Sequence, residues 1–191
     1  AWDSHATGVE GHFRDMEINP GNPAVIYAAT FHEDGGASFY RSGDHGDSFS
    51  ASMVGLPSTD QISRMEIEVT PASPGLVYLL NVRKDVEDLH SFYVSGDEGQ
   101  NWTEQQDGST NILAFGCSGG SGIGEGNSKL ALGASPRNEN ELYAGSLFMW
   151  KSTDGGKTWN VLSGFCGGYI PYVRPNHHAM EVSMTGVVYT G

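Results

Sequence analysis

The chain contains three copies of one short phrase, and this repetition constrains the fold more than any other feature of the sequence. Each copy reads Ser-x-Asp-x-Gly-x-x-aromatic, and the copies begin at Ser42, Ser95 and Ser152. The phrase is typical of a turn, because Asp accepts hydrogen bonds from nearby backbone N–H groups and Gly adopts positive φ. The spacings of 53 and 57 residues are close to or just above the periods of repeats that form propeller blades. A chain that repeats a hairpin at this period is expected to form one small sheet per repeat.

The segments between these phrases repeat as well. Met16-Glu17-Ile18 is echoed by Met65-Glu66-Ile67 and Met180-Glu181-Val182, with a degenerate copy at 130–132, and each is followed by a turn and an apolar run around a tyrosine. A third apolar run leads into the repeated phrase and a fourth follows it. This order predicts a four-stranded antiparallel meander. Almost no window shows apolar residues at helical spacing, so an all-β protein is expected.

We therefore predict a single β-propeller domain over residues 1–191. About three full four-stranded blades are expected at approximately 11–55, 61–106 and 128–163, with a partial blade at 177–191 that is completed by residues 1–8 or by missing residues. Both ends fall within a blade, which favours a piece of a longer propeller. The alternative is a four-bladed ring in which the first strand completes the last blade.

The repeated octapeptides resemble the Asp box of the bacterial neuraminidase-type (BNR) repeat. The resemblance covers nearly the whole chain. The repeats are similar to those in the propellers of sialidases, xyloglucanase-type glycoside hydrolases, sortilin-like receptors and photosystem assembly factors. It implies the fold and leaves the function open, because these relatives differ widely in function. Structural turn-and-anchor roles are expected for the residues that carry it: Ser42, Asp44, Gly46, Phe49, Ser95, Asp97, Gly99, Trp102, Ser152, Asp154, Gly156 and Trp159.

The glutamates of the first strands are the main candidates for binding. First strands line the channel of a propeller, so Glu17, Glu66 and Glu181 are expected near the axis, where they could bind a cation or polarise a substrate. The competing interpretation is that each pairs with an arginine such as Arg14 or Arg64, or faces solvent.

Histidine and cysteine offer weaker candidates. His177 and His178 precede the last first strand, but neighbouring residues of a strand point to opposite faces, which argues against one shared metal ion. Hydrogen-bonded structural histidines are the alternative. Cys117 and Cys166 lie in equivalent loops of adjacent blades, where they would either form a disulfide or remain buried thiols; two cysteines are too few for a metal cage. No metal site and no cofactor other than a cation in the channel are predicted.

Two loops depart from the repeat, at 83–88 and at about 105–127. Loops on a rigid scaffold often carry binding sites, and the alternative is that these are tolerated insertions without a role in binding. Neither supplies catalytic chemistry. Gly116–Gly120 matches Gly-x-Ser-x-Gly but lacks the helix that a nucleophile elbow requires. The arginine cluster of sialidases and the Arg-Thr-Asp-x-Gly-Gly motif of xyloglucanases are not found, so no catalytic residue is assigned.

Composition limits the partners. The net charge is −13, which argues against nucleic acid, and no apolar run reaches the roughly 20 residues of a membrane span. We expect a secreted, periplasmic or cell-surface bacterial protein. The leading hypothesis is a non-catalytic module that recognises a protein or a glycan. The alternatives are a glycoside hydrolase with catalytic residues partly outside this chain, and a structural subunit of a larger assembly in which another chain completes the propeller.

Overall fold

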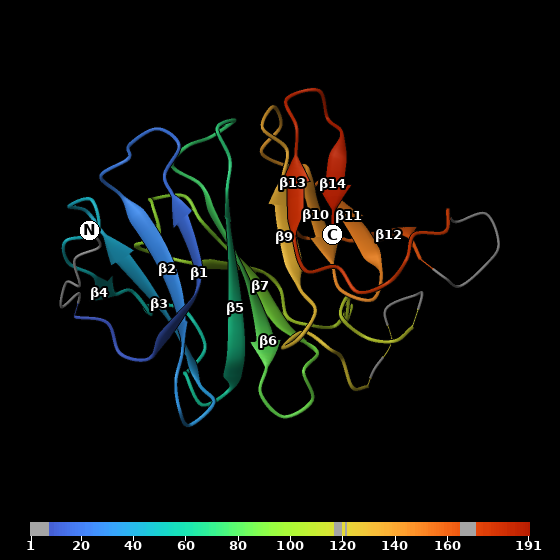
Figure 1. The fold of residues 1–191 in the computed structure, drawn as a ribbon, viewed down its shortest axis with the longest axis horizontal. Coiled ribbons are helices and arrows are strands. Elements are labelled where there is room, and N and C mark those ends of the chain that lie inside the picture. The colour runs from blue at the N-terminus through green and yellow to red at the C-terminus, as the bar shows by residue number, and fades with distance from the viewer. Residues whose placement is uncertain (1–7, 117–119, 121, 165–170) are drawn as a thin grey trace.

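The computed structural model describes residues 8–116, 120, 122–164 and 171–191. The described residues form strands, turns and loops without a helix. Three sheets have four antiparallel strands each and a fourth has two, and the sheets follow one another along the chain (Figure 1). The strands are β1 (His12–Ile18), β2 (Ile26–Phe31), β3 (Ala37–Ser42), β4 (Ser50–Ala51), β5 (Ile62–Val69), β6 (Val77–Arg83), β7 (Leu89–Ser95), β8 (Thr103–Gln106), β9 (Ala131–Ala134), β10 (Leu142–Gly145), β11 (Met149–Ser152), β12 (Asn160–Ser163), β13 (Met180–Val182) and β14 (Val188–Thr190).

Each sheet is a meander in which consecutive strands pair, and we number the sheets as blades 1 to 4. The predicted all-β fold with full blades of four strands and a partial blade at the C-terminal side is confirmed, whereas the predicted contribution of residues 1–8 lies almost wholly outside the described residues. The tyrosine of each second strand gives the common register: Tyr27, Tyr78, Tyr143 and Tyr189 face residues 17, 68, 133 and 181 of the first strand. Side chains alternate between the two sides of a strand. Each blade therefore has a tyrosine face and an opposite face, which we call the receiving face.

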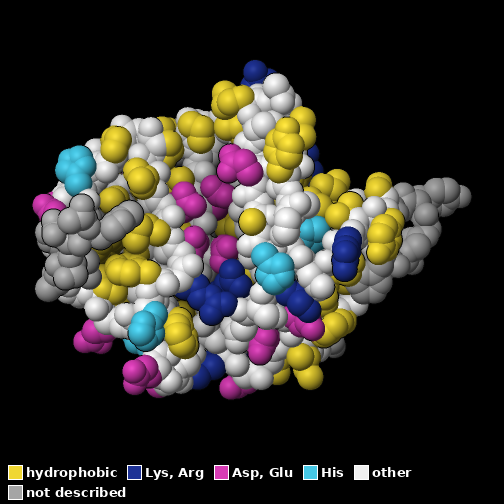
Figure 2. All heavy atoms as spheres, viewed as in Figure 1, with side chains coloured by type: hydrophobic (Ala, Val, Ile, Leu, Met, Phe, Trp, Pro, Cys, Tyr) yellow, Lys and Arg dark blue, Asp and Glu magenta, His cyan; other side chains and the backbone are white. Residues whose placement is uncertain are grey.

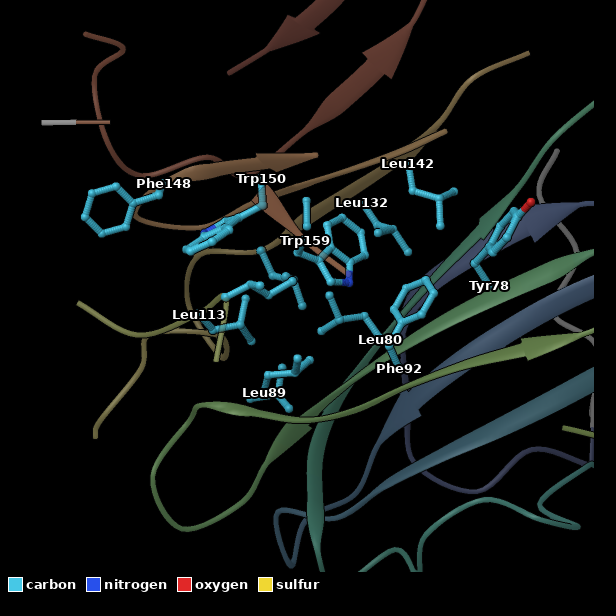
Figure 3. Close-up of a cluster of buried hydrophobic side chains, with 14 of the residues drawn as sticks. Tyr78, Leu80, Leu89, Phe92, Leu113, Leu132, Leu142, Phe148, Trp150 and Trp159 are labelled. Atoms are coloured by element: carbon cyan, nitrogen blue, oxygen red, sulfur yellow. The ribbon is translucent and has the colours of Figure 1, made fainter. Parts of the chain in front are cut away.

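The tyrosine face of one blade packs on the receiving face of the next. Between blades 1 and 2, Tyr27 and Phe39 join Met65, Ile67 and Leu79 in one buried cluster. Between blades 2 and 3, the larger cluster includes side chains from both blades (Figure 3), among them Tyr78, Leu80, Phe92, Leu132, Leu142, Trp150 and Trp159. The core therefore lies between blades, since burial of these apolar faces is what holds successive sheets together.

The three repeated phrases form turns between the third and fourth strands, and we call them Asp turns. In the first, the Ser42 hydroxyl accepts a hydrogen bond from Gly46 N at 2.9 Å and donates one to Asp44 Oδ1 at 2.7 Å. Asp44 Oδ1 also accepts from Ser48 N at 2.9 Å. The Ser95 and Ser152 turns repeat these bonds with distances of 2.8 to 2.9 Å. The same residue types therefore close the same turn three times.

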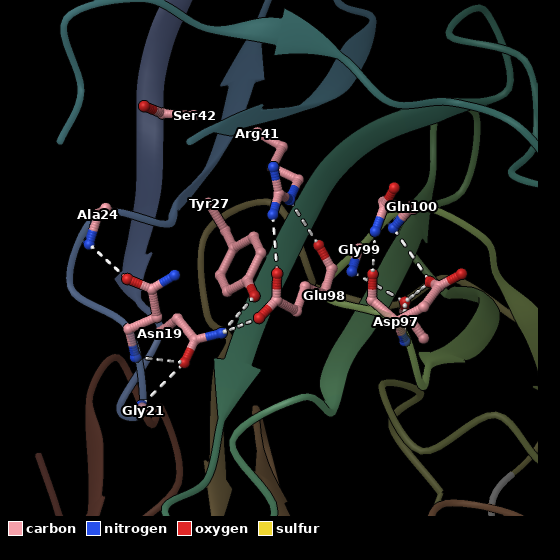
Figure 4. A network of polar contacts seen from close by, with 12 residues as sticks. Asn19, Gly21, Ala24, Tyr27, Arg41, Ser42, Asp97, Glu98, Gly99 and Gln100 are labelled. Carbon is pink, nitrogen blue, oxygen red and sulfur yellow. Dashed lines mark hydrogen bonds and ion pairs between the residues drawn. The ribbon is translucent and has the colours of Figure 1, made fainter. Parts of the chain in front are cut away.

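The second and third Asp turns also contact the preceding blade. Trp102 meets Phe39 edge-on at 4.9 Å between ring centroids, and Trp159 meets Phe92 in the same way at 5.5 Å. Figure 4 shows the polar part of the first junction, where Arg41 Nη2 lies 2.8 Å from Glu98 Oε2. Each of these turns thus anchors its blade to the one before it.

The described residues contain no long apolar helix of the kind that crosses a bilayer. The predicted Cys117–Cys166 pairing lies outside the described residues.

Candidate functional site

The first strands of blades 1, 2 and 4 border an acidic hollow. Five carboxylates from β1, β5 and β13 line a space of about 350 Å³. Figure 2 shows acidic side chains gathered at the middle of this face, with basic side chains at one border. The five acidic residues are Asp15, Glu17, Glu66, Glu68 and Glu181. The candidate glutamates Glu17, Glu66 and Glu181 are therefore brought together, and Asp15 and Glu68 join them.

The register changes which glutamates are equivalent. Glu17 and Glu181 lie opposite the blade tyrosines, and their counterpart in blade 2 is Glu68, which lies opposite Tyr78. Glu66 lies two residues earlier and corresponds to Asp15. Alignment of the Met-Glu-Ile triplets makes Glu66 the equivalent of Glu17. The sheet register does not, because the connection from the triplet to the tyrosine is two residues longer in blade 2 than in blade 1. The spacing i, i+2 of acidic residues on one face of a strand is the signal that indicates Asp15 and Glu68.

Blade 3 has glycine at the equivalent position, and packing explains the exchange. A Cβ on Gly133 would lie 3.1 Å from Met180 Cγ and 3.2 Å from Val182 Cγ2. Met180 and Val182 form the receiving face of blade 4, so the two-stranded sheet sits against blade 3 at a place where a glutamate would not fit. The hollow therefore has no carboxylate from blade 3.

Burial makes Asp15, Glu17, Glu66 and Glu68 hard to ionise, and repulsion from neighbouring carboxylates adds to this at the three glutamates. Burial, with repulsion from Asp15, Glu181 and Glu66, raises the pKa of Glu17 to about 7. Burial also raises the pKa of Glu68 well above its ordinary range and raises the pKa of Asp15. Crowded carboxyls cannot all be charged at low cost. Near neutral pH the hollow can therefore gain or lose protons when a charged group enters.

Arg64 and Arg14 are the cations that oppose the rise in the pKa of Glu66, and Arg64 is the one bonded to it. Its Nη2 lies 2.8 Å from Glu66 Oε2, and it donates to the carbonyl oxygens of Gly126, Asn127 and Leu130. Burial nevertheless raises the pKa of Glu66 to about 7, with Arg64 opposing the shift. The expected pairing with Arg64 thus holds for Glu66, whereas no ion pair among the described residues includes Glu17 or Glu181.

Asp15 joins blades 1 and 2 at the wall of the hollow. Its Oδ2 accepts a hydrogen bond from Ile67 N of β5 at 2.6 Å. A carboxylate that bridges two blades in this way is held in place by the backbone of its neighbour. The wall of the hollow is therefore a defined arrangement of groups.

The two departures from the repeat meet each other beside the hollow. Gly124 N donates to Val86 O at 2.8 Å, and Gly126 N donates to Glu87 O at 3.0 Å. Arg64 donates to Gly126 O and Asn127 O, and Arg14 donates to Asn127 O, so this pair of loops holds the arginines at the basic border of the site.

The histidines stand apart from the acidic cluster. His177 is buried, its Nδ1 lies 2.7 Å from Thr190 Oγ1, and burial lowers its pKa. His178 is exposed. Among the described residues, no group of three or more His, Cys, Asp and Glu side chains has an arrangement that could hold a metal ion.

The Asp-turn carboxylates lie outside the hollow, between third and fourth strands. Hydrogen bonds from Ser48 lower the pKa of Asp44 to about 2, and those from Asn101 do the same for Asp97. The pKa of Asp154 is also lowered, by hydrogen bonds from Thr158 that outweigh burial. These carboxylates are thus occupied as acceptors within their own turns.

No family model and no curated protein matches the chain. Among solved structures, it is similar to the GH74 enzyme of Niastella koreensis (TM-score 0.58, 16% identity, 93% of this chain and 25% of that one). It is also similar to the GH74 xyloglucanase of Xanthomonas campestris (TM-score 0.59, 18% identity, 92% and 26%).

Two further neighbours are binding proteins. YCF48 bound to D1 peptide gives a TM-score of 0.55 at 10% identity over 96% of this chain and 61% of that one. The Aleuria aurantia lectin in complex with Fucα1-6GlcNAc gives 0.51 at 12% identity over 93% and 61%. The chain spans about a quarter of the length of the GH74 enzymes. At these identities the likeness concerns the fold, and the chain has the architecture of part of a β-propeller.

Proposed function

We propose that this chain is a non-catalytic, extracytoplasmic propeller module that recognises a partner protein through the acidic hollow. The observation that supports this most is the meeting of five carboxylates from three blades around one space of about 350 Å³. Sites that bind by charge place like-charged groups in a concave surface, where the field is focused. The net charge of −13 would add attraction for a cationic partner at long range and would keep an extracytoplasmic protein soluble.

The lining favours a basic peptide segment over a sugar. The other residues at the hollow are aliphatic or methionine side chains, namely Ile67, Val69, Ala131, Leu132, Ala179 and Met180. None of these is aromatic, whereas aromatic side chains commonly line ligand pockets. An ammonium or guanidinium group with an aliphatic stem matches both the charge and the apolar part of this surface. The peptide-bound YCF48 structure offers a precedent on a similar fold.

The test is binding of a short fluorescent peptide that carries lysines and arginines, compared with the same peptide in which these are glutamines. We expect anisotropy to show binding of the basic peptide only, weakened by salt. Because the pKa values of Glu17 and Glu66 are about 7, binding should strengthen as pH rises from about 6 to about 8.

The variant Glu17→Gln should weaken binding by roughly tenfold, the loss of one partly buried charge contact. Glu33→Gln, an exposed glutamate in the turn between β2 and β3, is the matched control and should leave binding unchanged. Equal binding of both peptides, or equal loss in the two variants, would refute the proposal.

A glycoside hydrolase is the second candidate, and the raised pKa values are the observation that favours it. A carboxyl group whose pKa is near 7, such as Glu17 or Glu66, can act as a general acid beside an ionised carboxylate. Release of reducing sugar from xyloglucan, abolished by Glu66→Gln, would support this candidate over recognition.

A further inference from the structure

A cation of the third strand lies beside the tyrosine of the second strand in blades 1 and 3. In blade 1 this cation is Arg41, whose Nε and Nη2 donate to the carbonyl oxygen and to Oε2 of Glu98 at 2.9 and 2.8 Å (Figure 4). In blade 3 it is Lys151, whose Nζ lies 5.1 Å from the centre of the tyrosine ring and 3.2 Å from Glu141 Oε1. Each of these cations is thus paired with a glutamate.

Blade 2 and the third Asp turn lack both members of such a pair. Val94 lies opposite Tyr78, in the place of Arg41, and Gly155 occupies the place of Glu98 in the repeated phrase. Where these two side chains are missing, a pocket of about 190 Å³ opens between blades 2 and 3. Both of these blades have all four strands, so the pocket lies at a complete junction within the chain.

The walls of this pocket offer one carboxylate, one ammonium group and an apolar base. Leu76 and Val94 line it from blade 2, where both pack on the buried cluster between the blades. Glu139 and Lys157 line it from blade 3, and no ion pair among the described residues includes either of them. Burial and the nearby charge of Glu139 raise the pKa of Tyr78, which agrees with a carboxylate beside the pocket.

We propose that this pocket binds a small zwitterion, a free amino acid with a basic side chain. Its cation takes the place that Arg41 has in blade 1 and pairs with Glu139. Its aliphatic stem lies on Leu76 and Val94, and its carboxylate pairs with Lys157. A space of about 190 Å³ is smaller than the pockets that hold drug-sized ligands and suits a molecule of this size.

The pocket is separate from the acidic hollow. The two spaces share no lining residue, and the proposed recognition of a basic peptide does not enter the argument. The two proposals can therefore fail independently of each other.

The test is titration of the isotope-labelled protein with L-arginine, followed by the chemical shifts of its backbone amides. We expect saturable shifts at Val94, Asn140 and Gly155, with a dissociation constant on the order of 1 mM for so small a ligand. Agmatine, which lacks the carboxylate, and citrulline, which lacks the cation, should each bind about tenfold more weakly. Equal affinity for the three compounds, or no saturable shift at these amides, would overturn the proposal.

Single variants assign the contacts. Lys157→Met should weaken the binding of L-arginine by about tenfold and leave that of agmatine unchanged, because only the carboxylate loses its partner. Lys84→Met is the matched control, since Lys84 follows β6 and lies in the turn to β7, outside the pocket. Glu17→Gln, in the acidic hollow, should also leave the binding of L-arginine at these amides unchanged.

Transfer of the blade 1 pair gives the sharpest result. The double variant Val94→Arg with Gly155→Glu places a cation and a glutamate of the chain in the pocket, and it should no longer bind L-arginine. The backbone accepts the second exchange, because φ is +73° at Gly155 and +60° at Glu98. Urea unfolding checks that the double variant is folded, and Lys157→Met tests the site independently of it. Binding that persists in the folded double variant, or a loss in Lys84→Met equal to that in Lys157→Met, would contradict the proposal.

Discussion

Replacement of Glu17 by glutamine should stabilise the protein, and only at neutral to alkaline pH. Glu17 is partly buried beside Asp15, Glu66 and Glu181, and its pKa rises from 4.5 to about 7. A group whose pKa is raised by folding stabilises the native state below its unfolded pKa, and this stabilisation is lost as pH rises through the folded value. The difference between 4.5 and about 7 corresponds to at most about 3 kcal/mol.

The difference in the free energy of unfolding between wild type and Glu17→Gln depends on pH, because glutamine resembles the protonated acid at every pH. At about pH 4.5 both variants present a neutral side chain, and their free energies of unfolding should agree within about 0.5 kcal/mol. Above about pH 7 the wild type carries a poorly solvated carboxylate, and Glu17→Gln should be more stable by about 1–3 kcal/mol.

The assay is urea unfolding followed by tryptophan fluorescence at about pH 4.5, 6, 7 and 8. Glu33→Gln is the control and should show the same small effect at every pH, because Glu33 is exposed to water. If Glu17→Gln were equally stabilising at all pH values, or destabilising above pH 7, the electrostatic account of the hollow would be wrong.

Three further predictions concern the junctions between blades, and urea unfolding measures each of them. Gly156→Ala should destabilise by about 3 kcal/mol, because φ is +90° and the new Cβ would lie 2.2 Å from the ring of Phe92, whereas Gly96→Ala, with open space around it, should change stability by less than about 0.5 kcal/mol. Phe39→Ala should cost about 3–5 kcal/mol, since it empties a fully buried site at the junction of blades 1 and 2; a cost below 1 kcal/mol would contradict that packing. Arg64→Met should cost about 3 kcal/mol at about pH 8, because Glu66 must then take up a proton or stay charged without its partner. The cost should be smaller at about pH 5, where only the hydrogen bonds of Arg64 to backbone carbonyl oxygens are lost; a cost independent of pH would contradict this.

The fold could be predicted from the sequence because its determinants are local and repeated. Each Asp turn is closed by Ser, Asp and Gly within one phrase, so three copies predict three hairpins without reference to the rest of the chain. The apolar runs on either side of the turns then predict the strands. The tyrosines of the second strands mark the same register in every blade.

The site could be predicted only in part. The sequence indicated acidic first strands, but it aligned Glu66 with Glu17, and the sheet register shows Glu68 in that place. A shift of two residues keeps a side chain on the same face of a strand, so the apolar pattern of the strand does not reveal it. Asp15 and Glu68 were missed for the same reason.

The amino-acid sequence by itself determined the all-β repeat and its turns, because neighbours in the chain supply the hydrogen bonds and the periodicity that define them. Tertiary structure alone decided that carboxylates from β1, β5 and β13 share one hollow, that the pKa values of Glu17 and Glu66 rise, and that Met16 and Tyr189 are exposed. These properties depend on distances between blades and on which faces are covered. Such distances are set when apolar side chains of different blades, far apart in the chain, pack against one another. The burial that results from this packing is what raises the pKa values.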